Sequence, residues 1–184
     1  PTTEFTMSQS TDVPSGQGFS KSLKFDCTTA QGSFASGDSI KLEHRVEGQN
    51  VQYLKKGTSS AESVTMSFWV KSNKTGTYIA EVFDNTNSRQ ISKSYTINSA
   101  NTWEKKAVTY AGDTTGAFGN DNSSAINISW WLSAGSDFTS GTLQTSWDGQ
   151  IIAPIIASRM DLRRREEEQK GRLRTRSILR NLPR

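Results

Sequence analysis

Polar and apolar side chains alternate most clearly in two segments of the chain, residues 63–71 and 125–133. In the first, apolar side chains at every second position oppose Thr65, Ser67 and Trp69. In the second, the same alternation sets apolar side chains against Asn127, Ser129, Trp131 and Ser133. Successive side chains of a strand point to opposite faces, so each segment predicts a strand with one buried face and one open polar face. Each polar face carries a single tryptophan.

Further strand-like segments follow one another along the first 150 residues. The predicted strands are residues 5–9, 19–28, 39–47, 62–72, 77–84, 89–97, 102–111, 125–134 and 142–147. Turn-forming residues fill the gaps between them, and one short helix is expected at 49–56, ending at Gly57. Eight or nine short strands with almost no helix predict an all-β fold, a two-sheet antiparallel jelly-roll sandwich.

Charge divides the chain into two parts. Residues 1–150 carry twelve Lys and Arg against fourteen Asp and Glu, whereas residues 151–184 carry ten against four. The net charge of +4 therefore arises from a tail of +6 behind a body of −2. This predicts a jelly-roll domain over 1–150 and an Arg-rich, partly helical tail over 151–184.

The tail begins with the most apolar six-residue run of the chain, 151–156. Pro154 would interrupt the ladder of a central strand, so an interior strand is not expected there. An exposed run of this kind would promote aggregation. We therefore expect it to anchor the tail by burial against a neighbouring subunit or the open edge of the sandwich, through Ile151, Ile152, Ile155 and Ile156.

Arginines follow the anchor and provide candidate contacts to an anionic partner. They are Arg163, Arg164, Arg165, Arg172, Arg174 and Arg176. Nucleic acid is one such partner, and its binding would weaken steeply with salt. An ion-paired assembly helix is favoured instead, because three glutamates at 166–168 interrupt the basic run and the tail has no aromatic residue to stack on bases.

Composition excludes several other classes of protein. Only 33% of the 184 residues are hydrophobic, and no apolar run approaches the ~20 residues that span a bilayer, so membrane insertion is not expected. The single cysteine, Cys27, excludes an intrachain disulfide. It is in phase with Leu23 and Phe25, which predicts a small buried hydrophobic side chain.

Catalytic patterns are sparse. His44 is the only histidine, and its strand position favours a core or rim side chain over a general base. A glycosidase-like pair would have to come from Glu43, Glu81 and Glu104, for which scattered surface acids are the favoured interpretation. The sequence therefore predicts a protein without catalytic residues.

One loop has the composition of a calcium site. Asp113, Asp121 and Asn122 flank a Gly-rich stretch and offer oxygen ligands for a structural calcium ion. Their spacing is not that of an EF-hand. Solvated loop acids are the favoured alternative.

Tryptophan among small polar groups on a sheet face is typical of a sugar-stacking surface. Trp69 and Trp131 are the candidate platforms, Tyr53 and Trp103 are further aromatic candidates, and Asn127, Ser129 and Thr65 are candidate hydrogen-bonding groups. The alternative, favoured at each tryptophan, is that a strand, loop or subunit covers the ring, since large aromatic side chains also dominate interfaces.

Five segments in one order resemble the jelly-roll domain of marine bacteriophage tail-fibre and other virion structural proteins, which is similar in architecture to carbohydrate-binding modules. They are 18–30 (GFSKSLKFDCTTA), 46–57 (VEGQNVQYLKKG), 64–71 (VTMSFWVK), 101–106 (NTWEKK) and 110–118 (YAGDTTGAF). The resemblance implies a non-catalytic component of an extracellular virion. In the family, further sandwich sequence follows the segment that matches 141–147, whereas here the Arg-rich tail begins.

These observations favour a virion structural protein, a fibre, decoration or adaptor subunit that binds its own copies and other virion proteins and contacts host glycans. A missing last strand would leave an unpaired sheet edge, which favours pairing with another chain. Two alternatives stay open. In the first alternative, the primary role of the protein is that of a carbohydrate-binding module. In the second, the basic tail binds nucleic acid or another anionic partner.

Overall fold

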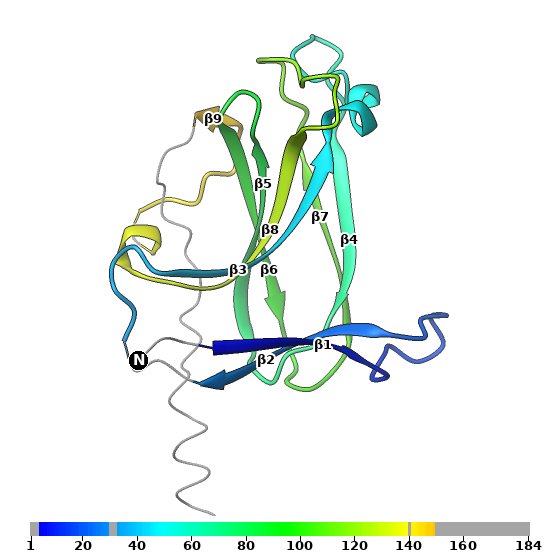
Figure 1. Ribbon diagram of the computed structural model, residues 1–184, viewed down its shortest axis with the longest axis vertical. Coiled ribbons are helices and arrows are strands. Elements are labelled where there is room, and N and C mark those ends of the chain that lie inside the picture. The colour runs from blue at the N-terminus through cyan, green and yellow to red at the C-terminus, as the bar shows by residue number, and fades with distance from the viewer. Residues whose placement is uncertain (1–3, 30–32, 140, 150–184) are drawn as a thin grey trace, which may run out of the picture. The chain divides into compact units, whose positions relative to one another are not determined.

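The computed structural model describes residues 4–29, 33–139 and 141–149 (Figure 1). They belong to two compact units, a hairpin before residue 34 and a body after it. Regular structure consists of antiparallel strands and short 3-10 turns, which confirms the predicted all-β fold. Within these ranges no helix has the length and apolar character needed to cross a bilayer.

The hairpin pairs β1 (Glu4–Ser10) with β2 (Ser22–Thr29). Its register places Phe5 opposite Cys27 and Met7 opposite Phe25, so these four side chains share one face. The rings of Phe5 and Phe25 stack with centroids 4.5 Å apart. Met7 is more than half exposed, and Cys27 is half-buried. Cys27 thus lies on the apolar face, as predicted, but is less buried than expected.

The body contains a five-stranded antiparallel sheet. Its strands lie in the order β3 (Ser39–Glu47), β8 (Ser124–Ala134), β5 (Gly76–Asp84), β6 (Arg89–Ile97) and β9 (Asp148–Gly149). The turn from β5 to β6 has the predicted composition, and the Asp84 carboxylate accepts hydrogen bonds from the backbone N–H groups of Thr86 and Asn87. The strand order makes neighbours of strands that are distant in the sequence, such as β3 and β8, as a jelly roll requires.

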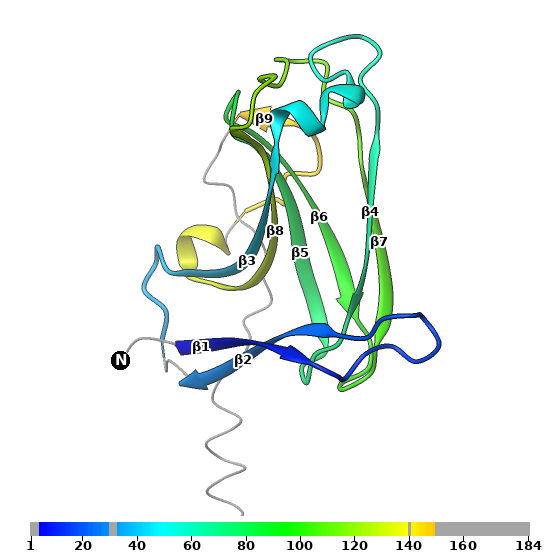
Figure 2. The same ribbon diagram turned by 45° about the vertical axis from the view of Figure 1, so that its right-hand side comes forward.

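A second sheet pairs β4 (Val64–Val70) with β7 (Glu104–Tyr110) and packs on one face of the first (Figure 2). The Phe68 ring meets Tyr95 and Trp130 edge-on, with centroids 5.1 and 5.7 Å away. Val108 and Tyr110 of β7 are also buried. The apolar phase predicted for 63–71 is therefore the face between the sheets.

Three local predictions differ from the structure. The expected helix at 49–56 is two 3-10 turns, η1 (Gly48–Asn50) and η2 (Gln52–Leu54), because Lys55 adopts a left-handed conformation (φ 50°) that ends the second turn. The expected strand at 142–147 is irregular. It runs beside β6 through one backbone hydrogen bond from Ser92 N to Gln144 O (2.7 Å), without a continuous ladder.

The third difference is a slip in the β3–β8 ladder. Lys41 pairs with Trp131, but the preceding Ile40 pairs with Ser133, so β8 carries one extra residue here. A bulge of this kind breaks the alternation of faces. Of the polar side chains predicted to share one face of residues 125–133, those from Asn127 to Trp131 therefore follow the regular alternation, and Ser133 lies beyond the bulge.

Phe68 tests the packing between the sheets. We expect Phe68→Ala to lower the free energy of unfolding by about 2 kcal/mol, because it removes a half-buried ring that contacts two aromatic neighbours. Ser67→Ala, on the exposed face of the same strand, should change it by less than about 0.5 kcal/mol. Urea unfolding of both variants makes the measurement, and equal effects would contradict the packing.

Candidate functional site

The five-stranded sheet has one face that carries polar side chains in rows. One row runs across β3, β8, β5 and β6 through Glu43, Ser129, Glu81 and Ser92. The adjacent row contains Lys41, Trp131, Ile79 and Ser94. Phe68 packs on Trp130 and Tyr95, which point the opposite way from Trp131 and Ser94. These rows, called the polar face below, therefore lie on the side of the sheet away from β4 and β7.

The centre of the polar face is buried, not open as predicted, whereas Lys41 and Ser94 at its margins are exposed. The exposed fractions are 0% for Ser129, 1% for Ser92, 5% for Glu81 and 5% for Trp131. Yet the hydroxyls of Ser129 and Ser92 have no hydrogen-bond partner. Most buried polar groups in proteins are hydrogen-bonded, and further exceptions occur on the face between the sheets, at the Tyr110 hydroxyl and the Trp130 indole N–H.

Trp131 is covered by the loop that follows its own strand. Its ring lies 5.4 Å from that of Phe138 in η3 (Ser136–Phe138), and it clusters with Ile79 and Ala134, against which Phe138 and Leu143 pack. The Lys41 ammonium lies 5.4 Å from the ring centroid. The alternative expected for this residue, a ring covered by a loop, is confirmed. Trp131 is not an open stacking platform in this structure.

Glu81 is the buried acid of the polar face, although the sequence favoured a surface position. Burial raises its pKa to about 7, against the opposing charge of Lys41 and the nearby indole N–H of Trp131. Glu43, in the same row, adds a like charge that raises it further. The alternation of Ile79, Glu81 and Phe83 along β5 is the sequence signal that could have indicated a buried position for this carboxyl.

Trp69 lies on the exposed face of the second sheet, as predicted. The hydroxyls of Thr65 and Thr109 are 2.9 Å apart across this face, and Lys105 stands opposite Trp69. Trp69 is half-buried. Since both sheets separate this face from the polar face, Trp69 and Trp131 do not form one platform.

The remaining glycan candidates are dispersed. Tyr53 is strongly exposed on η2, and Trp103 is half-buried in the turn between β6 and β7. Asn127 shares the polar side of β8, but its amide is bonded internally: Asn85 Nδ2 and Ser124 Oγ donate to its Oδ1 over 2.7 and 2.9 Å. Trp131, Trp69 and Tyr53 therefore lie in three different places, on the polar face, on the outer face of the second sheet and on η2.

A buried ammonium joins the loops at the other end of the body. Lys56 Nζ lies 2.7 Å from Asp84 Oδ2 and 3.1 Å from Asp113 Oδ2, and it donates to the carbonyls of Thr115 and Gly116 over 2.7 Å each. The rings of Phe118 and Trp147 lie 5.2 and 5.6 Å from it. These groups, called the Lys56 centre below, surround the ammonium with oxygen atoms and aromatic rings.

The Lys56 centre replaces the predicted calcium site. Burial raises the pKa of Asp113, but hydrogen bonds from Arg89, the Thr115 N–H and Lys56 outweigh it and hold the pKa below its usual value. Asp121 accepts the Ser123 N–H instead (2.9 Å). Across 4–29, 33–139 and 141–149, no three His, Cys, Asp or Glu side chains cluster in a way that could hold a metal. The Lys56 ammonium and the Arg89 guanidinium thus both pair with the Asp113 carboxylate, which was expected to bind calcium.

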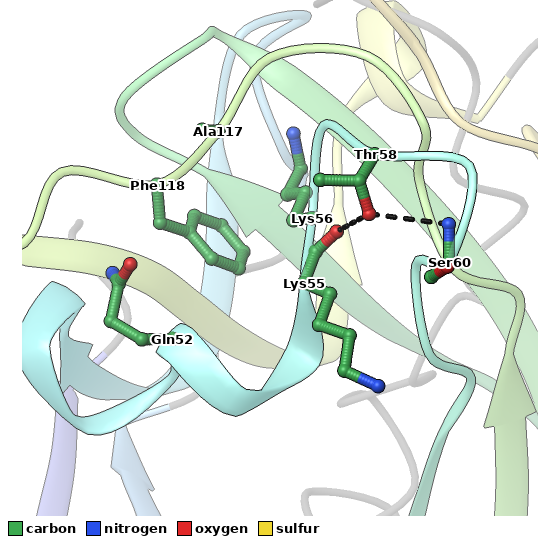
Figure 3. A pocket seen from close by; sticks show the side chains of 7 residues that line it. All are labelled: Gln52, Lys55, Lys56, Thr58, Ser60, Ala117 and Phe118. Carbon is green, nitrogen blue, oxygen red and sulfur yellow. Dashed lines mark hydrogen bonds between the residues drawn. The ribbon is translucent and has the colours of Figure 1, made fainter.

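An open pocket of about 470 Å³ adjoins the Lys56 centre (Figure 3). Its lining comprises Gln52, Lys55, Lys56, Thr58, Ser60, Ala117 and Phe118. Thr58 Oγ1 donates to the Lys55 carbonyl and accepts the Ser60 N–H, and Lys55 Nζ pairs with Glu62. The volume of this pocket falls in the range of small-molecule sites. The sequence did not indicate the pocket, because its lining comes from two segments that are distant in the chain and meet only in the fold, through the Lys56 centre and through hydrogen bonds such as that from Gln52 Nε2 to the Gly119 carbonyl (3.1 Å).

The other acid candidates have structural roles. Hydrogen bonds from Lys106 and from the backbone N–H groups of Ser99 and Asn98 lower the pKa of Glu104 to about 2. Glu43 pairs with Lys41 and Arg45. His44 is exposed on β3, which agrees with a rim position.

The predictions for the tail lie outside the described residues. They concern the anchor (Ile151, Ile152, Ile155 and Ile156) and the arginines from Arg163 to Arg176. The chain matches no protein-family model, no curated protein and no solved structure. Function is therefore argued from the described residues themselves.

Lys56 and its neighbour Lys55 provide a matched pair of variants. We expect Lys56→Met to lower the free energy of unfolding by about 3 kcal/mol or more, since it removes the cation beside the buried Asp84 carboxylate and one of the two cations beside Asp113. Lys55→Met breaks an exposed pair with Glu62 and should cost less than about 1 kcal/mol. Chemical denaturation at pH 7 compares them, and similar losses would show that the Lys56 centre contributes little.

Glu81 should make stability depend on pH. The folded protein retains this proton up to about pH 7 and the unfolded chain releases it near pH 4.5, so the unfolded state binds fewer protons between these values. The free energy of unfolding should therefore fall by up to about 3 kcal/mol as pH rises through this window.

Glu81→Gln removes this ionisation, so the variant should exceed wild type in stability at pH 8 by more than at pH 5. Urea unfolding at both pH values measures the difference. Glu62→Gln, which removes an exposed carboxylate, is the control and should follow wild type. A Glu81→Gln variant with the pH dependence of wild type would contradict the assignment.

Proposed function

We propose that this chain is a non-enzymatic structural subunit of a bacteriophage virion, which assembles with its own copies and other virion proteins in the extracellular particle. A fibre, decoration or adaptor subunit fits this role. The observation that carries the proposal is the set of strand edges without a partner. The resemblance of five ordered segments to virion jelly rolls supports it.

Among the described residues the outer edges of β4 and β7 lack a partner strand, as does that of β3. Within the described ranges β4 and β7 pair only with each other, so each leaves one edge without a ladder. The pair is held in place because its apolar face packs on the five-stranded sheet through Phe68. A fixed strand with an unpaired edge presents N–H and C=O groups that another chain can pair with. Subunit assembly is the role such an edge suits.

Hydrogen exchange on the full chain tests the proposal. Association through these edges should protect backbone amides of β4 and β7 as the protein concentration rises, while amides of β5, already central in its sheet, keep their protection. Light scattering in parallel gives the oligomeric state. A monomer at the highest concentration, with unchanged exchange in β4 and β7, would contradict assembly through these edges.

Contact with host glycans is a second candidate role. The observation that favours it is the polar face, where the Ser129 and Ser92 hydroxyls lack hydrogen-bond partners on either side of the Glu81 carboxyl. Sugars offer many hydroxyls that complement such groups. The two roles are compatible, because a fibre subunit both assembles and binds its receptor.

A further inference from the structure

The second sheet has an outer face, turned away from the five-stranded sheet, that carries polar and small side chains. They lie in three cross-strand rows: Trp69 with Lys105, Ser67 with Ala107, and Thr65 with Thr109. All are exposed except Trp69, which is half-buried. Among the described residues of the body, no strand lies on this side of β4 and β7 (Figure 2). Solvent therefore reaches the outer face, unlike the centre of the polar face.

The outer face is a flat strip with an aromatic ring at one end and two hydroxyls at the other. Thr65 precedes Trp69 by four residues, so the two ends are roughly 13 Å apart along the strand. The row between them consists of Ser67 and Ala107, whose side chains are too small to divide the strip. The Thr65 and Thr109 hydroxyls are 2.9 Å apart, and whichever donates, the other keeps its own O–H for an external acceptor.

Lys105 gives the outer face a positive charge beside the aromatic ring. It stands directly opposite Trp69, where paired residues have Cβ atoms about 4.5–5.5 Å apart. Within 4–29, 33–139 and 141–149, its ammonium forms no ion pair. Glu104, the adjacent acid, alternates to the other side of β7 and pairs with Lys106. Since the three rows contain no carboxylate, the face is complementary to an anion.

We propose that the outer face binds an acidic glycan built of hexuronic-acid units, with one sugar ring stacked on Trp69 and its carboxylate paired with Lys105. Neighbouring units lie along the strip and hydrogen-bond to Thr65 and Thr109. The inference rests on the glycan-contact role and adds to it a location outside the polar face and a class of ligand.

The chemistry of the strip selects this class of ligand. A pyranose ring has an apolar C–H face, which packs on the flat apolar surface of an indole, and a rim of hydroxyls, which suits the threonine hydroxyls. A uronic acid adds the carboxylate that complements Lys105. A neutral sugar would use the ring of Trp69 but not the cation, whereas an inorganic anion would use the cation but not the ring. Only an acidic sugar uses both.

The test is an NMR titration of the isotope-labelled full chain with the trimers of galacturonic acid and of mannuronic acid, each compared with its neutral methyl ester. The readouts are the Trp69 indole N–H resonance and the backbone amides of Ser67 and Thr109, with the buried Trp131 indole as the internal reference. At least one acidic trimer should shift the readouts. Its methyl ester should bind about fivefold more weakly, the upper end for an exposed ion pair.

Three variants separate stacking from charge. Trp69→Ala should weaken binding of the acidic trimer about tenfold. Lys105→Gln should weaken it about fivefold and leave binding of the methyl ester unchanged. Lys55→Gln removes the same charge from an exposed lysine elsewhere in the body and is the control that keeps wild-type binding. The thermal midpoint of each variant shows that it folds.

Four results would overturn the inference. Equal binding of an acidic trimer and its methyl ester would reject the ligand class. Equal losses in Lys105→Gln and Lys55→Gln would show attraction to overall charge. Shifts at Trp69 that grow with protein concentration without sugar would show that a second copy covers the face. No shift with either acidic trimer would reject the site.

A glycan array separates failure of this site from failure of the glycan-contact role. Array binding that Trp69→Ala retains would place the contact elsewhere on the chain and leave that role intact. No array binding by the wild-type chain would reject the role together with the site, while the assembly role would stand on its own measurements.

Discussion

The Lys56 centre is the constraint on which one end of the body depends. Its ammonium ties the end of β5, through Asp84, to the loop after β7, through Asp113 and the carbonyls of Thr115 and Gly116. A charge with a 3% exposed side chain is tolerated only when oxygen atoms replace its hydration, and four do so here. Without this charge, two buried carboxylates would repel each other. The pocket wall and the position of Phe118 follow from the same contacts.

The Lys56 centre and the polar face represent opposite solutions to burying polar groups. At the Lys56 centre each charge is matched, with Arg89 adding a second cation to Asp113 over 2.7 Å. The charges of the Lys56 centre therefore neutralise one another within the fold. On the polar face Lys41 pairs with Glu43, but the hydroxyls of Ser129 and Ser92 lack hydrogen-bond partners. The fold therefore bears the cost of removing these two hydroxyls from water.

Much of the fold could be predicted because alternation is a local property of the sequence. Strands β3 and β6 have the bounds that their alternation gave, and the apolar phase of β4 faces the core. The burial of the polar face could not be predicted, because it depends on contacts from Phe138 and Leu143, which follow β8. The bulge before Ser133 and the irregular course of 142–147 likewise arise from pairing between distant strands, which no local pattern encodes.

The site was predicted only in part for the same reason. Trp131 and Ser129 stood out because they interrupt an apolar strand, but Glu81 and Ser92 gain their meaning only from the ladder that sets them beside Ser129. Asp113 illustrates the opposite error. Its loop has the composition of a cation site, and it does bind cations, but they are the side chains of Lys56 and Arg89 from other parts of the chain. Composition indicated the chemistry, and only the fold could identify the partner.

The stability of the two-stranded sheets, β1–β2 and β4–β7, is relevant to assembly. An isolated pair of strands is marginal in water, so each pair needs a partner for its apolar face. The β4–β7 pair has one, since Phe68 packs on Trp130 and Tyr95. The β1–β2 pair stacks Phe5 on Phe25 but leaves Met7 and Leu23 more than half exposed on the same face. Its order therefore depends on contacts beyond the pair, and a protein that assembles can draw such contacts from another subunit.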